Sequence, residues 1–222
     1  MRSESLHQRL DRWRLEELLQ KYRGLRLRPS AGNQLRIVGA FEFQATAAGK
    51  EAINDSYDVE ILLLEEFPNK IPTINEIGGR IPRTFHKLED GSLCLGSPTR
   101  LRLMLFETPT LLAFVERALI PYLYSRSYYE RHGTMPFGEL EHGVKGLLQD
   151  VADLFLASGD DAAIEYVRVS AMTRRQANKE RCPCSSGRRL GTCHHRSVNM
   201  LRDRLGRAWF QMVFRNLSVR LD

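Results

Sequence analysis

Three of the four cysteines lie within twelve positions of one another, and this cluster limits what the C-terminal part of the chain can fold into. The segment from Arg181 to His195 has the sequence Arg-Cys-Pro-Cys-Ser-Ser-Gly-Arg-Arg-Leu-Gly-Thr-Cys-His-His. Four ligands with this spacing can close tetrahedrally on one zinc ion and leave no position for water. We therefore predict a structural zinc site, with a chance cluster of reduced thiols as the alternative. Its ligands would be Cys182, Cys184, Cys193 and His194, with His195 as an alternative fourth ligand.

This spacing resembles the SEC-C motif, which is found at the tail of the preprotein translocase ATPase and on many bacterial proteins. The core pattern Cys-Pro-Cys-x-Ser-Gly-basic-basic is reproduced, with Ser185 where the motif usually has its first Gly. A segment this short cannot build an apolar core of its own, so its folding should depend on the metal.

The fourth cysteine, Cys94, follows an Asp90-Gly91 turn within Thr84-Phe-His-Lys-Leu-Glu-Asp-Gly-Ser-Leu-Cys-Leu95. This position predicts a thiol at the lip of a loop, with His86 eight residues upstream. An exposed thiolate is a strong nucleophile, so Cys94 is a candidate acyl acceptor. The alternative is a half-buried cysteine that packs as a small hydrophobic residue.

The remaining pattern predicts a sheet with helices before and after it. A capping-box sequence at Ser5 predicts a helix of about five turns. Apolar residues that alternate with polar ones predict strands at 35–43 and 57–64, and a shorter strand is expected at 73–77. Later helices are expected from 108 to 123, 144 to 156, 164 to 172 and 198 to 212, and the stretch 125–142 is expected to be an ordered loop.

This order of elements, together with Gly91-Ser-Leu-Cys94-Leu95, resembles the ubiquitin-conjugating enzymes. In that family an N-terminal helix and an antiparallel meander precede a Gly-x-(Ile/Leu)-Cys-Leu turn and further helices. The resemblance covers residues 1–157 and implies an α+β fold, with a small helical zinc-binding appendage at 158–222. Two features downstream of Cys94 depart from the family: Gly96 replaces a frequent Asp, and Phe106-Glu-Thr-Pro109 only approximates the usual Trp-Ser-Pro.

The resemblance also implies roles for individual residues. His86 stands where the family usually has the Asn of His-Pro-Asn, which stabilises the oxyanion while a lysine attacks the thioester. A histidine there could donate the same hydrogen bond and titrate near neutral pH. His132 and His142 would border the site, in a loop whose Gly-Glu-x-x-His-Gly segment is similar to one in bacterial relatives.

By this resemblance, Cys94 would carry the C-terminal glycine of a ubiquitin-like protein, or of a glycine-tailed partner, as a thioester, supplied by an activating enzyme. An amine, such as a lysine on a target protein, would then attack. Bacterial relatives belong to antiphage systems, some of which modify oligonucleotide-synthesising nucleotidyltransferases, so such an enzyme is a candidate target. A non-catalytic binding module of the same fold stays open, as does, more remotely, a cysteine hydrolase with a base near Cys94.

The net charge of +6 is unevenly distributed along the chain. Residues 1–158 contain 20 Lys+Arg and 21 Asp+Glu, whereas residues 159–222 contain 13 and 6. The basic tail favours docking to an acidic surface of a protein or a nucleic acid, with a solvated helical face as the alternative. The sequence has no apolar run of ~20 residues and no apolar signal core at its N-terminus, so we expect a cytoplasmic protein without membrane contact.

Overall fold

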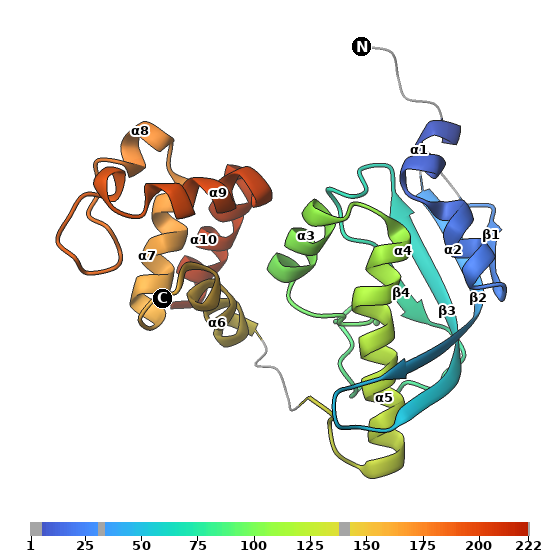
Figure 1. Ribbon diagram of the computed structural model, residues 1–222. Coiled ribbons are helices and arrows are strands. Elements are labelled where there is room, and N and C mark those ends of the chain that lie inside the picture. The colour runs from blue at the N-terminus through green and yellow to red at the C-terminus, as the bar shows by residue number, and fades with distance from the viewer. Residues whose placement is uncertain (1–5, 31–33, 138–142, 222) are drawn as a thin grey trace. The chain divides into compact units, whose positions relative to one another are not determined.

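The computed structural model describes residues 6–30, 34–137 and 143–221 (Figure 1). The chain divides into two compact units, Met1–Glu139 and Leu140–Asp222. Helix α6 (Gly143–Phe155) belongs to the second unit, where it packs against α7 (Asp160–Ala171). The structural division therefore lies earlier in the chain than the boundary expected from the sequence between residues 157 and 158.

The first unit is built on a four-stranded antiparallel sheet with the order β1-β2-β3-β4. This meander confirms the predicted α+β class. The three predicted strands are present, and β2 and β3 form a hairpin that is longer than expected because their pairing continues through Thr46 and Ala52. β1 was not predicted. The strands are β1 (Leu25–Arg28), β2 (Gln34–Thr46), β3 (Ala52–Leu64) and β4 (Thr73–Glu76).

The N-terminal helix is interrupted rather than continuous. It consists of α1 (Leu6–Arg12) and α2 (Leu15–Lys21), and Arg14 between them has a left-handed backbone with φ of 54°. Leu15 and Leu18 of α2 are buried against the sheet core. The break therefore lets α2 turn its apolar face inward, although the capping pattern at Ser5 had predicted one helix.

A second helical run covers the sheet after the Cys94 turn (Figure 1). It begins with α3 (Pro98–Glu107), which was not predicted, and continues through α4 (Leu111–Phe114), a π-helical turn (Val115–Leu119) and α5 (Ile120–His132). The predicted loop over 125–142 is wrong for residues 125–132, which are helical. Ser125 and Ser127 are buried there, so contact with the rest of the unit overrides the polar composition of this stretch.

Gly24 and Gly39 bring β1 and β2 into unusually close backbone contact. A Cβ atom on Gly24 would lie 2.1 Å from the carbonyl oxygen of Ala40, and one on Gly39 would lie 2.1 Å from that of Gly24. Gly39 also has φ of 148°, which other residues rarely adopt. Glycine at both positions is therefore a condition for this strand pair.

The second unit is helical and has its own apolar core. The rings of Phe155 and Tyr166 stack with centroids 4.7 Å apart, and Phe210 packs beside Phe155. The predicted basic helix over 198–212 is two helices that meet at Gly206. Its apolar residues Val198, Leu201 and Leu205 are buried. The unit contains α6, α7, α8 (Arg174–Ala177), a 3-10 turn (Leu190–Thr192), α9 (His195–Leu205) and α10 (Arg207–Leu221).

Candidate active-site turn and metal centre

The Asp90-Gly91 turn is held by a dense set of local hydrogen bonds. The amide of Leu88 donates to the carbonyl of Ser92 (2.8 Å), and the amide of Gly91 donates to that of Leu88 (2.9 Å). The Asp90 carboxylate accepts from the amide and hydroxyl of Ser92 (2.9 and 2.6 Å), which lowers the pKa of Asp90. Gly91 has φ of 87°. The predicted turn is confirmed, and it leads the chain directly to Cys94.

The turn fixes Cys94 through backbone bonds on both sides. The amide of Leu93 donates to the carbonyl of Ile74 in β4, and the amide of Cys94 donates to the carbonyl of His86, each over 2.8 Å. Cys94 is half-buried. His86 has φ of 39°, a left-handed conformation that asparagine, aspartate and histidine tolerate better than most residues. The structure therefore brings the two predicted site residues together, through the His86 carbonyl.

Tyr122, from α5, completes this arrangement and was not predicted. Its hydroxyl donates to the carbonyls of Phe85 (3.1 Å) and His86 (3.3 Å). Burial, and then the proximity of the Cys94 thiolate, raise the pKa of Tyr122. The hydroxyl therefore stays protonated at neutral pH and stays a donor. No local pattern could have revealed it, because Tyr122 lies on a distant helix.

His132, another predicted site histidine, does not join this group. His132 ends α5, with Nε2 3.1 Å from a Glu51 carboxylate oxygen and its ring 4.2 Å from that of Tyr128. It lies ten residues beyond Tyr122, which corresponds to ~15 Å along the helix. The structure therefore does not bring His132 to the Cys94 turn. His142 lies outside the described residues.

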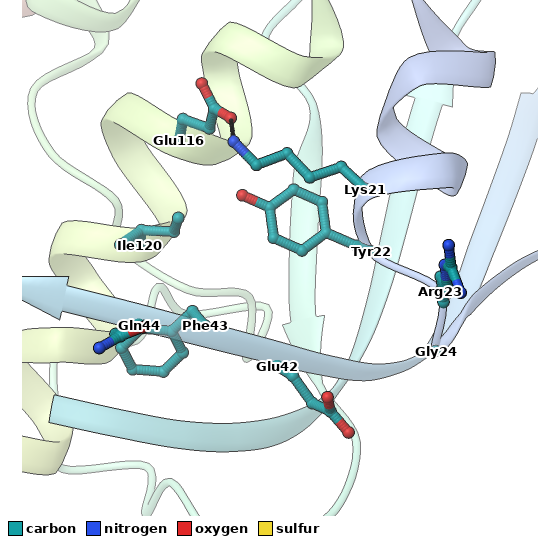
Figure 2. Close-up of a pocket in the computed structure, with 9 residues that line it drawn as sticks. All are labelled: Lys21, Tyr22, Arg23, Gly24, Glu42, Phe43, Gln44, Glu116 and Ile120. Atoms are coloured by element: carbon teal, nitrogen blue, oxygen red, sulfur yellow. Dashed lines mark hydrogen bonds and ion pairs between the residues drawn. The ribbon is translucent and has the colours of Figure 1, made fainter.

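A separate hollow of about 730 Å³ lies on the first unit, between the end of α2, β2 and the π-helical turn (Figure 2). The Lys21 ammonium donates to the Glu116 carboxylate across it, and this bond raises the pKa of Lys21. Burial raises the pKa of Tyr22 beside them. Neither Cys94 nor His86 is among its lining residues, so this hollow is not the cavity of the Cys94 site.

The second candidate centre gathers the four predicted metal ligands. Their ligand atoms all lie within 4.8 Å of one another. The Cys184 and Cys193 sulfurs are 3.6 Å apart, and His194 Nδ1 lies 3.2 Å from the Cys182 sulfur and 3.3 Å from that of Cys193. His194, rather than His195, thus completes the group. These residues form a compact set that can bind a metal ion.

A short hairpin positions the first two of these cysteines. The Cys182 amide donates to the Arg188 carbonyl (2.8 Å), and the Leu190 amide donates to the Glu180 carbonyl (2.9 Å). Ser185 and Gly187, with φ of 60° and 71°, turn the chain between them. The His194 ring meets the edge of the Tyr166 ring with centroids 6.3 Å apart. His194, the residue before α9, thereby contacts α7 in the second unit.

Ser186 is a further polar group at this centre that the sequence analysis did not identify. Its Oγ lies 3.2 Å from the Cys184 sulfur and 3.5 Å from that of Cys193. Hydrogen bonding to Ser186 is the main cause that lowers the pKa of Cys184 to about 6, whereas burial raises the pKa of Cys182. One thiol of the group is therefore readily deprotonated, and thiolates are the metal-binding form.

No protein-family model, curated protein or solved structure matches this chain. None of the helices that the structure describes has both the length and the apolar character needed to cross a membrane. Any assignment therefore depends on the residues themselves. They form two centres, a hydrogen-bonded cysteine turn on a meander sheet and a Cys3His group on a helical unit.

Proposed function

We propose that this chain is a ubiquitin-conjugating-enzyme-like transferase that carries an acyl group on Cys94, as part of a bacterial antiphage system. The observation that carries the proposal is the bond from the Cys94 amide to the His86 carbonyl, on a turn attached to β4 of an antiparallel meander. This arrangement holds a half-buried thiol in a fixed position, next to the residue that replaces the family's Asn.

The chemistry consists of two acyl transfers. The Cys94 thiolate attacks the carbonyl carbon of a glycine thioester on an activating enzyme, and the thiolate of that enzyme leaves. An amine of the target then attacks the new thioester, the Cys94 thiolate leaves, and the amine loses a proton to solvent or to a base. The products are an amide and the free thiol, so no oxidant or reductant is needed.

His86 supplies stabilisation of the oxyanion in this proposal. The tetrahedral intermediate of each transfer carries negative charge on the former carbonyl oxygen, and a fixed donor nearby lowers the barrier. The bond between the His86 carbonyl and the Cys94 amide keeps His86 beside the thiol. In this proposal its side chain donates the hydrogen bond to the oxyanion.

For the second centre we propose zinc with a structural role. Three thiolates and one imidazole are a preferred zinc donor set, and zinc–ligand bonds of 2.0–2.3 Å place tetrahedral ligands ~3.4–3.8 Å apart. Three of the ligand-atom pairs are 3.2–3.6 Å apart and all four ligand atoms lie within 4.8 Å of one another, which is close to the size of such a site. When bound, the metal would cross-link the hairpin to the start of α9 through its four ligands and leave no position for a substrate.

Acylation of the full-length protein by a small glycyl-glycine thioester tests the proposal without a known modifier. Intact-mass measurement should show one added acyl group, which hydroxylamine removes. Cys94→Ala should stay unmodified, and Cys94→Ser should form at most a slow, hydroxylamine-resistant ester. Cys184→Ala serves as the matched thiol control and should still be acylated at Cys94.

Three other outcomes would contradict it. Full acylation of Cys94→Ala would assign the reaction to other thiols. Cleavage of a peptide bond that requires Cys94, with water and not an amine as the final acceptor, would favour a cysteine hydrolase. An unmodified wild-type protein that also fails to load a ubiquitin-like protein from its activating enzyme and ATP would favour a binding module.

A further inference from the structure

We propose that the hairpin of the second unit binds the phosphate backbone of nucleic acid, with Arg181 and Arg189 as its central contacts. This surface takes no part in the acyl transfer proposed above, and the inference stands without it. It follows from the pairing of the hairpin, the absence of neutralising carboxylates and the lack of an apolar anchor.

Arg181 and Arg189 are directly opposite each other across the hairpin. They form an antiparallel bridge, and the flanking bonds run from the Cys182 amide to the Arg188 carbonyl and from the Leu190 amide to the Glu180 carbonyl. This pattern defines a non-hydrogen-bonded pair, the type in which Cα atoms approach to ~4.5 Å and side chains leave on the same face. The two exposed arginine side chains therefore project from neighbouring Cα positions on one face of the hairpin.

Like charges that are directly opposite in a ladder destabilise it. The only carboxylate in the segment 179–189 is Glu180, and it is ion-paired with Arg168 over 2.9 Å. Within the described residues, no ion pair neutralises the exposed basic side chains of this region. They are Arg175, Lys179, Arg181, Arg188, Arg189 and Arg196. An anion bound between Arg181 and Arg189 would relieve their repulsion. The pair of uncompensated positive charges therefore favours anion binding.

The chemistry of the surface favours phosphates over protein or membrane. Protein interfaces depend on aromatic and aliphatic anchors, and membrane association depends on apolar side chains that insert. The hairpin offers small polar residues at its tip, Ser185, Ser186 and Gly187, and its Leu190 is buried. Guanidinium groups match phosphate oxygens with paired hydrogen bonds. Contacts of this type hold the backbone without reading base sequence.

Fluorescence anisotropy with a labelled single-stranded DNA of mixed sequence, ~20 nucleotides long, tests the inference on the full-length, zinc-loaded protein. Titrations at several salt concentrations between ~50 and ~200 mM KCl should show an affinity that falls steeply with salt. The double substitution Arg181→Gln and Arg189→Gln should raise Kd at least ~10-fold near 100 mM KCl. It should also reduce the slope of log Kd against log salt by ~1.4, because each phosphate contact to a single strand contributes ~0.7 and two contacts are lost.

The matched control replaces Arg23 and Arg28, two exposed arginines of the first unit, by glutamine. It removes the same charge from the chain, and its Kd should stay that of the wild type. Zinc content and melting temperature monitor folding, and the hairpin variant should melt no lower than the wild type because a repulsion has been removed. If the double variant loses zinc, Arg189→Gln alone should still raise Kd about threefold.

An unchanged Kd and salt slope in the folded hairpin variant would overturn the inference. An equal loss of affinity in the control would also do so, since binding would then follow net charge alone. If the wild-type protein does not bind the DNA but binds phosphatidylserine vesicles or polyglutamate, the surface is a binding site for a membrane or for an acidic protein instead.

Discussion

Backbone carbonyls organise the neighbourhood of Cys94. The carbonyl of His86 accepts from both the Cys94 amide and the Tyr122 hydroxyl, and the same hydroxyl also donates to Phe85. One tyrosine on α5 thus fixes the segment that carries His86. The position of His86 relative to Cys94 therefore depends on Tyr122, which lies outside the turn.

Replacing Tyr122 by phenylalanine tests this dependence. The change leaves two carbonyls without their side-chain donor, so we expect a loss of about 1 kcal/mol in the free energy of unfolding. We also expect slower acylation of Cys94, because the turn loses its anchor. Tyr124→Phe is the control, since Tyr124 makes a comparable bond, to the Glu51 carbonyl at 2.9 Å. Urea unfolding and acylation rates should show similar destabilisation for both variants and a rate defect only for Tyr122→Phe.

His86 combines a left-handed backbone with a side chain that can donate, and the two roles can be separated. His86→Gly keeps the backbone conformation without strain, so the protein should fold and load a thioester, but transfer to an amine should slow on the order of 10²-fold. His86→Asn keeps both properties and should retain most of the transfer rate. Single-turnover transfer to free lysine is the measurement. Equal rates for both variants would make His86 a purely backbone residue.

Some residues of the two candidate sites could be predicted from the sequence, and others could not. Cys94 and the four candidate metal ligands follow from short patterns in which the reactive side chains lie close together in the sequence. Tyr122 and Ser186 could not be found in this way. Tyr122 acts across the fold, and Ser186 is set apart from Ser185, the other serine of the hairpin, by its short distances to two sulfurs.

The helix α5 shows why the prediction failed for one stretch and succeeded for the sheet. Apolar and polar residues alternate in β2 and β3 because one face of each strand is buried, and this alternation made the two strands predictable. Residues 125–132 have many polar and aromatic side chains, a composition typical of loops. In the structure, the hydroxyls of Ser127 and Tyr57 are 2.9 Å apart, and Ser127 also donates to Asp55 over 2.6 Å. The polar side chains of α5 are thus bonded to the sheet.

Asp55 is the acidic centre of this contact between β3 and α5. Burial alone would raise its pKa, but hydrogen bonds from Arg80 and Ser127 outweigh burial and lower it to about 2, from the ordinary 3.8. The ionised carboxylate therefore stabilises the fold above pH ~3.8, and this contribution is lost as the pH falls towards ~2. Its size at neutral pH is of order 2 kcal/mol.

Asp55→Asn should therefore be less stable than the wild type at pH 6 and should approach it near pH 2. Urea unfolding can be followed by the fluorescence of buried Trp13 in a Trp209→Phe background, so that the signal reports the first unit. Asp58→Asn, an exposed position on the same strand, should leave the pH dependence intact. A constant difference between Asp55→Asn and wild type over this pH range would contradict the argument.

The chain as a whole divides into two units, and each contains one of the two candidate sites. Cys94 belongs to the first, and the Cys3His group and the exposed arginines around it belong to the second. The sequence predicted the Cys94 turn, the Cys/His cluster and the uneven charge, but it grouped α6 with the first unit, whereas α6 packs against α7 in the second. The Phe155 ring of α6 stacks on the Tyr166 ring of α7, which joins α6 to the second unit. A contact between two helices cannot be read from a local sequence pattern.

Removal of the metal should therefore affect one unit only. In Cys182→Ser with Cys184→Ser, or after chelation, amide hydrogen exchange should rise over residues 178–205, because the hairpin and α9 lose their cross-link. Exchange in β2 and β3 should not change. Metal analysis should give one zinc per wild-type chain and none in the variant, and Cys94→Ala should keep its zinc. Unchanged exchange over 178–205 without metal would remove the structural role.

The paired glycines 24 and 39 have a consequence for how variants of this chain would fail. β1 is only four residues long, and it covers part of one edge of the much longer β2. Any larger residue at either glycine would push β1 away through a backbone clash and leave those edge amides and carbonyls of β2 unpaired. Free strand edges pair with other molecules. Such variants should appear as insoluble protein during expression, and the chemistry of Cys94 would have no part in the loss.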